Sequence, residues 1–376
     1  MLEPESETEG ETITIHELLE RSARAALDLQ REDGSFPPGR NGVYDEPETP
    51  VRTTSHWLTT LSKVYEITGD EKFADAANDA ADYLLSDEAR PHGYTFHSRN
   101  VDGKDKCDGL VGQAAPIRGL ARAGSVLNRR ELLEAAKDVF SLHPFDTRLG
   151  LWQRVEIDGV KLSFDRTLNH QILFAGAAAH LASEYRSVEK VIECFVRRLQ
   201  SNVETRSDGI IRHYVRPPLL KSVQSAIFNP SHWKLIANDL LSRLYTYSSK
   251  RREKEIGYHP VNLLGISHIQ LNIDSIDVQK GNRVLIDDII LPNSISKVYM
   301  GDIHYGGMTP GIDIALALHS FRKGGSGEVR QWIETDLETK YDTNSGLLSR
   351  GTGDPTFQAA TISYAVDLPN QEVKVG

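Results

Sequence analysis

The chain has 376 residues, of which 39% are hydrophobic and 26% are charged, and its formal net charge is −10. This composition predicts a folded protein with a large core rather than a disordered chain. The negative charge argues against a nucleic-acid-binding surface, and the sequence holds no apolar run of about 18 residues that predicts a membrane span. Two cysteines, Cys107 and Cys194, are too few for a disulfide framework or a cysteine zinc site, which favours a reducing, cytoplasmic location.

Most of the chain has the apolar periodicity of amphipathic helices. Residues 1–12 are predicted to be an acidic, disordered tail without the features of a signal peptide. In residues 15–30 the apolar side chains then recur at helical spacing, and Gly69 with Asp70 predicts the end of one helix and the cap of the next. Helices are predicted in this way at 15–30, 53–67, 70–85, 108–123, 129–141, 166–184, 187–202, 230–248, 258–270, 309–321, 327–339 and 355–366.

A glycine followed by aromatic, aliphatic or polar residues recurs between successive helix pairs. The instances begin at Gly34, Gly93, Gly150, Gly209, Gly301 and Gly346, so the intervals are 59, 57, 59, 92 and 45 residues. Three intervals near 60 indicate a repeat of one helical hairpin and one loop. The long interval indicates an insertion, which we expect as a small β insertion near 271–300 because this segment is rich in β-branched residues.

Helical hairpins of this kind bury their apolar faces by packing against one another. The fold class predicted from the rhythm is therefore all-α, an (α/α)6 toroid of six hairpins that forms a single domain over residues 13–370. An open helical solenoid is the alternative, but such arrays have shorter units of about 34 residues. In the toroid the recurring loops gather at one mouth of a central funnel.

The loops run into helices whose first residues are rich in acid, base and hydrogen-bonding groups. Asp108 and Asp165 lie 57 residues apart, which matches the repeat and predicts that they sit side by side at the mouth. Arg52 and His56 are four residues apart and so share one face of a helix. Each aspartate alone is explained as well by helix capping, and Arg52 by a structural ion pair. The coincidence of these groups favours a binding site.

Other residues near the predicted helix starts suit a sugar ligand. Aromatic faces stack on sugar C–H surfaces, arginines bind carboxylates in a bidentate manner, and a carboxylic acid can donate a proton. No histidine or aspartate pair has metal-ligand spacing, so neither a metal nor a cofactor is predicted. The candidate substrate-binding residues are Arg52, His56, Trp57, Gln113, Asn169, His170, His213, Tyr258, His259 and Arg350.

Two segments carry a resemblance to a known superfamily. Residues 108–124 (DGLVGQAAPIRGLARAG) and 164–182 (FDRTLNHQILFAGAAAHLA) resemble the six-hairpin carbohydrate-active enzymes, most strongly the unsaturated glucuronyl hydrolases. The chain also looks like the hydrolase-like proteins of archaeal and bacterial glycan-assembly clusters. The resemblance in fold spans roughly residues 15–366, whereas the resemblance in motif covers about forty residues.

The resemblance implies a mechanism. Asp165 would act as general acid and base, protonating the double bond of an unsaturated uronic acid and activating water, while Asp108 would orient the substrate. Asn169, His170 and Arg52 would contact the ligand. The partner implied is an oligosaccharide or a uronic-acid-containing glycan.

Two other functions remain open from the sequence. Sugar 2-epimerases share the toroid and use paired histidines, for which His56, His170 and His259 are candidates, and a uronate epimerase would be a relative of this idea. A non-catalytic glycan-binding subunit is the third reading, because fold does not prove activity. The sequence leaves the sugar, the linkage and the oligomeric state open.

Overall fold

The computed structural model describes residues 11–228, 232–233, 236–237, 249–274 and 309–375. Within them the chain is mostly helical, with short strands in the connections, so the predicted fold class is confirmed. Most of the predicted helix at 230–248, the loop at Gly301 and nearly all of the predicted β insertion fall outside the described residues. The helices are α1 (Ile15–Leu27), α2 (Val51–Thr68), α3 (Glu71–Leu85), α4 (Val111–Val126), α5 (Arg130–Leu142), α6 (Leu168–Ala179), α7 (Arg186–Asn202), α8 (Leu219–Phe228), α10 (Ser249–Asn272), α13 (Pro310–Ser320), α14 (Ser326–Lys340) and α15 (Pro355–Ala360), with 3-10 turns η1 (Gly42–Tyr44) and η3 (Thr361–Asp367).

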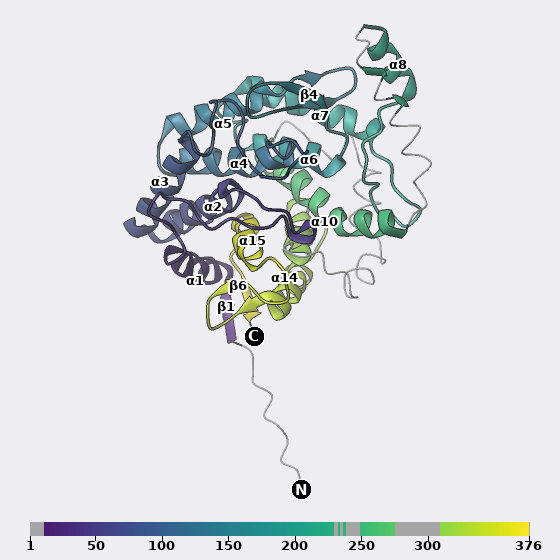
Figure 1. The fold of residues 1–376 in the computed structure, drawn as a ribbon. Helices are drawn as coiled ribbons and strands as arrows, with labels where there is room; N and C mark the ends of the chain where they lie inside the picture. Colours follow the sequence, from purple (N-terminus) through teal and green to yellow (C-terminus); the bar gives the residue numbers. More distant parts are fainter. Residues whose placement is uncertain (1–10, 229–231, 234–235, 238–248, 275–308, 376) are drawn as a thin grey trace.

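The inner elements form a closed ring. Helix α2 packs against α4, α4 against α6, α6 against α10 and α10 against α13, and η3 contacts both α13 and α2. Helices α1, α3, α5, α7 and α14 lie outside this ring, each packed on an inner neighbour (Figure 1). The alternation of outer and inner helices along the chain is the arrangement that the sequence rhythm predicts.

Inner and outer helices differ in how their side chains are buried. Helix α1 has a single apolar stripe that includes Ile15, Leu18 and Leu19, as expected for an outer helix. Helix α2 is buried at every position from Val51 to Ser62, although many of these residues are polar. Several of its hydroxyl groups donate to the carbonyl one turn earlier in the helix, as where Ser55 Oγ donates to the Val51 carbonyl at 2.6 Å.

A pair of terminal strands closes the ring. Strand β1 (Glu11–Thr14) pairs antiparallel with β7 (Glu372–Val375), so the first and last strands of the described chain lie side by side (Figure 1). The predicted domain boundaries at 12 and 370 both fall short of this pair, because Ile13 and Val373 are buried in the core. The folded unit of the described chain therefore extends from Glu11 to Val375.

The connection between α5 and α6 is a small sheet rather than an exposed loop. Strands β2 (Phe145–Asp146), β3 (Leu151–Val155) and β4 (Lys161–Phe164) pair antiparallel in the order β2-β3-β4. Trp152, which follows Gly150 in one of the glycine-led loops, belongs to the core, since its side chain is 1% exposed and packs against Phe174 and Phe195. A second hairpin joins β5 (Tyr341–Asp342) to β6 (Leu347–Leu348).

Glutamines on the inner helices tie the connecting loops to the ring. Gln113 Nε2 donates to the carbonyls of Phe96 and Cys107, and its Oε1 accepts from the Phe96 amide at 2.8 Å. Gln171, 58 residues later, does the same with Trp152 and Asp165. Both side chains are fully buried, so each repeat holds its mouth loop through the same three hydrogen bonds.

None of the helices in the described parts of the chain combines the length and the apolar character that crossing a bilayer requires.

Candidate functional site

A cavity of about 250 Å³ lies inside the ring of inner helices. Side chains from the starts of the inner helices and from the mouth loops line it, together with residues farther along the same helices. The polar and aromatic lining residues are Asn41, Tyr44, Glu46, Arg52, His56, Arg99, Lys104, Asp108, Arg118, Thr167, Asn169, His170, His213, Tyr258, His268, Thr309, Asp313, Phe357, Thr361 and Tyr364. A pocket of this kind, with convergent polar groups, is typical of a small-molecule site.

At the mouth, Asp108 is held by two arginines. Its Oδ1 atom lies 2.7 Å from Arg99 Nη1, and its Oδ2 atom pairs with Arg52 Nη2. Arg52 also pairs through Nη1 with Glu48 Oε1 at 2.9 Å. Asp108 has a left-handed backbone with φ of +53°, a conformation that costs energy for a residue with a side chain. Asp108 does not cap a helix, because α4 begins at Val111 and its N-cap is Leu110. The Asp108 carboxylate forms ion pairs with Arg52 and Arg99 instead.

Glu48 is the carboxyl group of this network whose charge is most strongly opposed by burial. Its carboxyl group is 1% exposed, and this burial raises its pKa to about 7 even though Arg52 favours the charged form. Burial and two carboxylates act in opposite directions on Arg52, and the carboxylates prevail, so its pKa is raised. Arg52 and Asp108 form an ion pair at the edge of the cavity, while Glu48 titrates near neutral pH.

Asp165 lies one layer behind the cavity and holds His170. Its Oδ2 atom accepts a hydrogen bond from His170 Nδ1 at 2.9 Å and one from the Leu110 amide at 3.2 Å, and its Oδ1 atom accepts from the Thr167 amide at 3.1 Å. Asp165 is 5% exposed and does not line the cavity, whereas His170 does. The aspartate thus joins the start of α6 to the start of α4, and the histidine is the group that a ligand meets.

The pair has the electrostatics of an ion pair. Burial would raise the pKa of Asp165, but the His170 imidazole and the backbone amides outweigh it and hold the pKa at about 2. Burial likewise opposes charge on His170, and the Asp165 carboxylate outweighs it, so the pKa of His170 is raised above its ordinary value. Asp165 is therefore ionised at neutral pH and has no proton to donate, while His170 carries or exchanges one.

A second histidine in the cavity has the opposite character. Burial and the neighbouring His170 lower the pKa of His213 to about 3, which keeps its imidazole neutral. Its ring stacks on Tyr258 with centroids 5.4 Å apart, and the Tyr258 hydroxyl lies 2.9 Å from that of Tyr44. The cavity wall therefore holds one imidazole whose pKa is raised and one whose pKa is lowered.

His56 and Asn169 also line the cavity. His56 Nδ1 lies 2.7 Å from the Ser363 hydroxyl, and burial together with Arg118 lowers the pKa of His56 well below its ordinary value. The Asn169 side chain is 3% exposed, and its Oδ1 atom has no hydrogen-bond partner among the described residues. Asn169 therefore offers a free acceptor toward the space that a ligand would fill.

Besides Asp165, four of the residues predicted from the sequence do not line the cavity. Trp57 is buried in the core against Phe36. Gln113 holds its loop, as described above, and His259 accepts from the Ile211 amide at 3.2 Å in a corresponding role. Arg350 donates to the carbonyls of Tyr341 and Glu338 at the end of α14.

Several groups of the site carry too little signal in the sequence to be found there. Arg99 precedes Asp108 by nine residues in a loop, and nothing in its neighbours marks it. Arg118 and Asp313 lie on inner helices, α4 and α13. The only feature of the sequence that could have indicated them is a charged residue within an otherwise apolar stretch. Asp313 is 1% exposed, and its burial next to Asp336 raises its pKa well above the ordinary value, which favours its protonated form.

Comparison with solved structures gives the same fold. A cellobiose 2-epimerase from Bacillus thermoamylovorans matches with a TM-score of 0.62 over 93% of this chain and 98% of its own, at 12% identity. A D-mannose isomerase matches with a TM-score of 0.61 over 94% of this chain and 96% of its own, at 12% identity. An inactive α-1,6-mannanase from Salegentibacter, solved with α-1,6-mannotriose, matches with a TM-score of 0.54 over 94% of this chain and 98% of its own, also at 12% identity. The toroid neighbours are thus carbohydrate-processing enzymes.

Sequence comparison gives the family. No family model matches the chain. A protein of Haloferax volcanii described as archaeal glycosylation protein Q is 39% identical over 371 residues, which cover 96% of this chain and 99% of that protein. At this identity and coverage, the chain belongs to the family of archaeal glycosylation protein Q.

Proposed function

We propose that this protein is a carbohydrate-processing enzyme in which His170 moves a proton of the bound sugar and Asp165 positions its ring. The observation that carries the proposal is the Asp165–His170 pair, which opens onto the cavity through the histidine. A carboxylate behind an imidazole fixes its tautomer and stabilises its cation, which suits general acid–base catalysis. This differs from the role in which Asp165 itself is the acid, because an aspartate with a pKa of about 2 has no proton to give at neutral pH.

The reaction that this site suits best is epimerisation or isomerisation of a sugar. Groups whose environments push their pKa values apart are suited to serve as acid and base. His170, whose pKa is raised, can take the proton from a carbon next to a carbonyl and return one, while His213, too weak a base at a pKa of about 3, can donate a hydrogen bond to that carbonyl as a neutral imidazole. The epimerase and the isomerase among the structural neighbours support this choice as analogies of fold.

An acidic sugar is the proposed substrate class. Four cationic side chains line the cavity, Arg52, Arg99, Lys104 and Arg118. The acidic side chains in the same lining are Glu46, Asp108 and Asp313, and burial raises the pKa of Asp313 well above its ordinary value, which favours its neutral form. The cavity is thus more positive than the chain as a whole, whose net charge is −10, and this difference favours an oligosaccharide or a glycan that carries a uronic acid. A cytoplasmic location belongs to the same proposal.

Hydrolysis is the second candidate, and Asp313 is the observation that favours it. A carboxylic acid that keeps its proton at neutral pH can protonate a glycosidic oxygen or the double bond of an unsaturated uronide. Asp313 lines the cavity, and its Oδ1 atom has no hydrogen-bond partner within the described chain. In this reaction Asp313, rather than Asp165, is the proton donor.

A proton-NMR time course in D₂O separates these reactions. The protein is offered free sugars and saturated and 4,5-unsaturated uronosides, beside the His170→Asn and Asp313→Asn variants. Deuterium entering C2 or C5 of an uncleaved sugar, and lost in His170→Asn, supports the epimerase. Sugar release that persists in His170→Asn but stops in Asp313→Asn replaces it with the hydrolase. Line broadening of a bound sugar without exchange or cleavage overturns both and leaves a glycan-binding subunit.

A further inference from the structure

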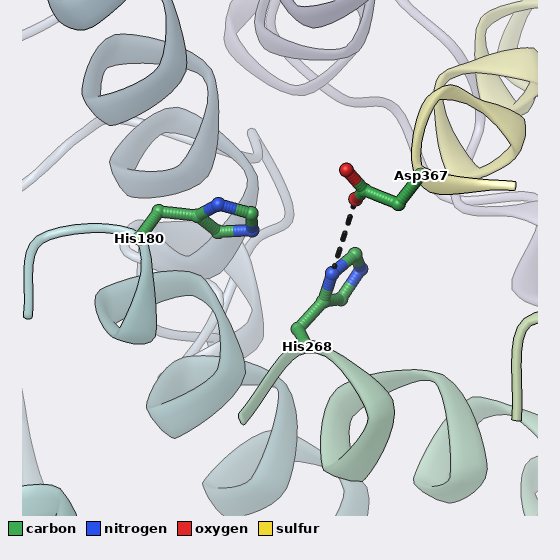
Figure 2. A group of neighbouring side chains, drawn as sticks. All are labelled: His180, His268 and Asp367. Carbon is green, nitrogen blue, oxygen red and sulfur yellow. Dashed lines mark ion pairs between the residues drawn. The ribbon is translucent and has the colours of Figure 1, made fainter. Parts of the chain in front are cut away.

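Three potential metal-binding side chains converge at the end of the ring opposite the mouth. His180 caps the C-terminus of α6, His268 lies in the last turns of α10, and Asp367 is the last residue of η3. One atom from each of them lies within 4.8 Å of the others. Figure 2 shows the two rings and the carboxylate pointing toward one another from three separate elements.

The polar atoms in this cluster lack hydrogen-bond partners among the described residues. They are His180 Nε2, both ring nitrogens of His268, and Asp367 Oδ2. His268 is 2% exposed, and its Nδ1 atom lies 3.5 Å from Asp367 Oδ2, which is too long for a good hydrogen bond. Buried polar groups that remain unpaired are costly, and a shared ligand would satisfy several of them at once.

The surroundings prepare these groups to bind a cation. Arg122 Nη1 donates to Asp367 Oδ1 at 2.6 Å, which fixes the carboxylate and leaves Oδ2 toward the histidines.

Charge near the cluster acts in both directions. Arg118 and Arg122 repel a cation and so limit its affinity, although Asp367 neutralises part of this charge. The C-terminal ends of α6 and α10 carry partial negative charge and favour a cation there. Burial raises the pKa of Asp313 well above its ordinary value, which favours its neutral form and so limits any attraction that it adds. The balance predicts a site of moderate affinity.

We propose that His180, His268 and Asp367 bind a divalent transition-metal ion, with Zn²⁺ as the ion that their two nitrogens and one oxygen suit best. The ligand atoms would be His180 Nε2, His268 Nδ1 and Asp367 Oδ2. Bonds of about 2.1 Å to Zn²⁺ require side-chain adjustments of about 1 Å from the present separations. The ion would fasten α6, α10 and η3 together beneath the cavity, a structural role that is independent of the proposed reaction.

This site could not be predicted from the sequence, because the three proposed metal ligands are far apart along the chain. His180, His268 and Asp367 are separated by 88 and 99 residues. No two of them lie on one element at the spacing by which zinc sites are recognised in sequences. Closure of the ring is what brings them together.

The test uses the full chain after removal of metal with a chelator. Calorimetric titration with Zn²⁺ is expected to give about one equivalent bound per chain, and thermal unfolding is expected to shift upward in Zn²⁺ and return with chelator. Co²⁺, used as a spectroscopic probe, is expected to show the intense visible absorption of a four- or five-coordinate ion. The His180→Gln and His268→Gln variants are expected to bind Zn²⁺ more than about tenfold more weakly.

A matched control is His92→Gln, because His92 is exposed and outside the cluster. This variant is expected to bind like the unmodified chain. Equal binding by the two cluster variants, or a weak six-coordinate Co²⁺ spectrum in the unmodified chain, would overturn the proposal. The Co²⁺ spectrum needs no substitution, so it decides the question even where a variant fails to fold by circular dichroism.

Discussion

The Asp165 carboxylate stands behind the His170 ring and accepts a hydrogen bond from its Nδ1 atom at 2.9 Å. This contact fixes a proton on Nδ1 and leaves Nε2 as the nitrogen that faces a ligand. Because the Asp165 Oδ2 atom also accepts from the Leu110 amide, the same carboxylate joins two neighbouring repeats. The position of the histidine thus depends on the closure of the mouth between α4 and α6.

The first prediction concerns the charge of His170. Asp165→Asn is expected to lower the pKa of His170, because the carboxylate that outweighs the burial of the ring is removed. The measurement is an NMR titration of the His170 imidazole between pH 4 and 9, a range set by the ordinary histidine pKa of about 6.5. Asp75→Asn serves as the control, since Asp75 is exposed on α3. An unchanged His170 titration in Asp165→Asn would mean that the carboxylate does not set the charge of the ring.

The second prediction concerns the pH dependence of stability at Glu48. A carboxyl group whose pKa rises on folding binds its proton more tightly in the native state, so its contribution to stability falls as the pH rises from its ordinary value of 4.5 toward about 7 and beyond. The free energy of unfolding is expected to drop by up to about 3 kcal/mol over this range through Glu48. Glu48→Gln is expected to remove that part of the dependence.

Urea unfolding at several pH values measures the Glu48 effect. Glu134→Gln is a suitable control, because Glu134 forms an exposed pair with Arg130, and this variant is expected to keep the dependence of the unmodified chain. The same slope in Glu48→Gln and in the unmodified chain would show that Glu48 does not carry the shift.

The third prediction concerns the glutamines that hold the mouth loops. Gln171→Leu leaves the Trp152 amide and the carbonyls of Trp152 and Asp165 buried without this partner. A loss of about 3 kcal/mol in the free energy of unfolding is expected, since each buried unpaired group costs about 1–3 kcal/mol. Gln331→Leu, at an exposed position of α14, is expected to change stability by less than about 0.5 kcal/mol. Equal losses in the two variants would show that the hydrogen bonds to the loop contribute nothing specific.

The helices and their order could be predicted from the sequence because each outer helix buries one face. The apolar residues of that face recur at helical spacing in the sequence. The predicted 70–85 and 187–202 differ from α3 and α7 by one residue at one end, and Asp70 caps α3 through the Lys72 amide as expected. The strand sheet between α5 and α6 was missed, since its strands are too short to show an alternating pattern. The terminal strand pair joins the two ends of the chain, a distance over which no local pattern acts.

The sequence predicts where the candidate site lies better than it predicts what each of its residues does. Repeat spacing identified the inner-helix starts, and seven predicted residues line the cavity, namely Arg52, His56, Asp108, Asn169, His170, His213 and Tyr258. Spacing cannot distinguish a residue that faces a ligand from one that faces a loop. Gln113 and His259 therefore looked like ligand contacts although they bind backbone groups of the mouth loops. The role of Asp165 depends on which atom lies beside it, and that depends on ring closure.

The last prediction concerns the close contact between α6 and α10. A Cβ atom on Gly176 would lie 2.5 Å from the Gly265 carbonyl oxygen, so alanine fits there only if two backbones move apart. Gly176→Ala is expected to lower the free energy of unfolding by more than about 3 kcal/mol, because the shift also separates the packed side chains around it. Gly327, in α14, has nothing within 4 Å of its Cβ position. Gly327→Ala is therefore expected to stabilise the protein by up to about 1 kcal/mol through the better helix propensity of alanine. Urea unfolding of both variants measures the difference, and equal effects would show that the inner helices have room to separate at no cost.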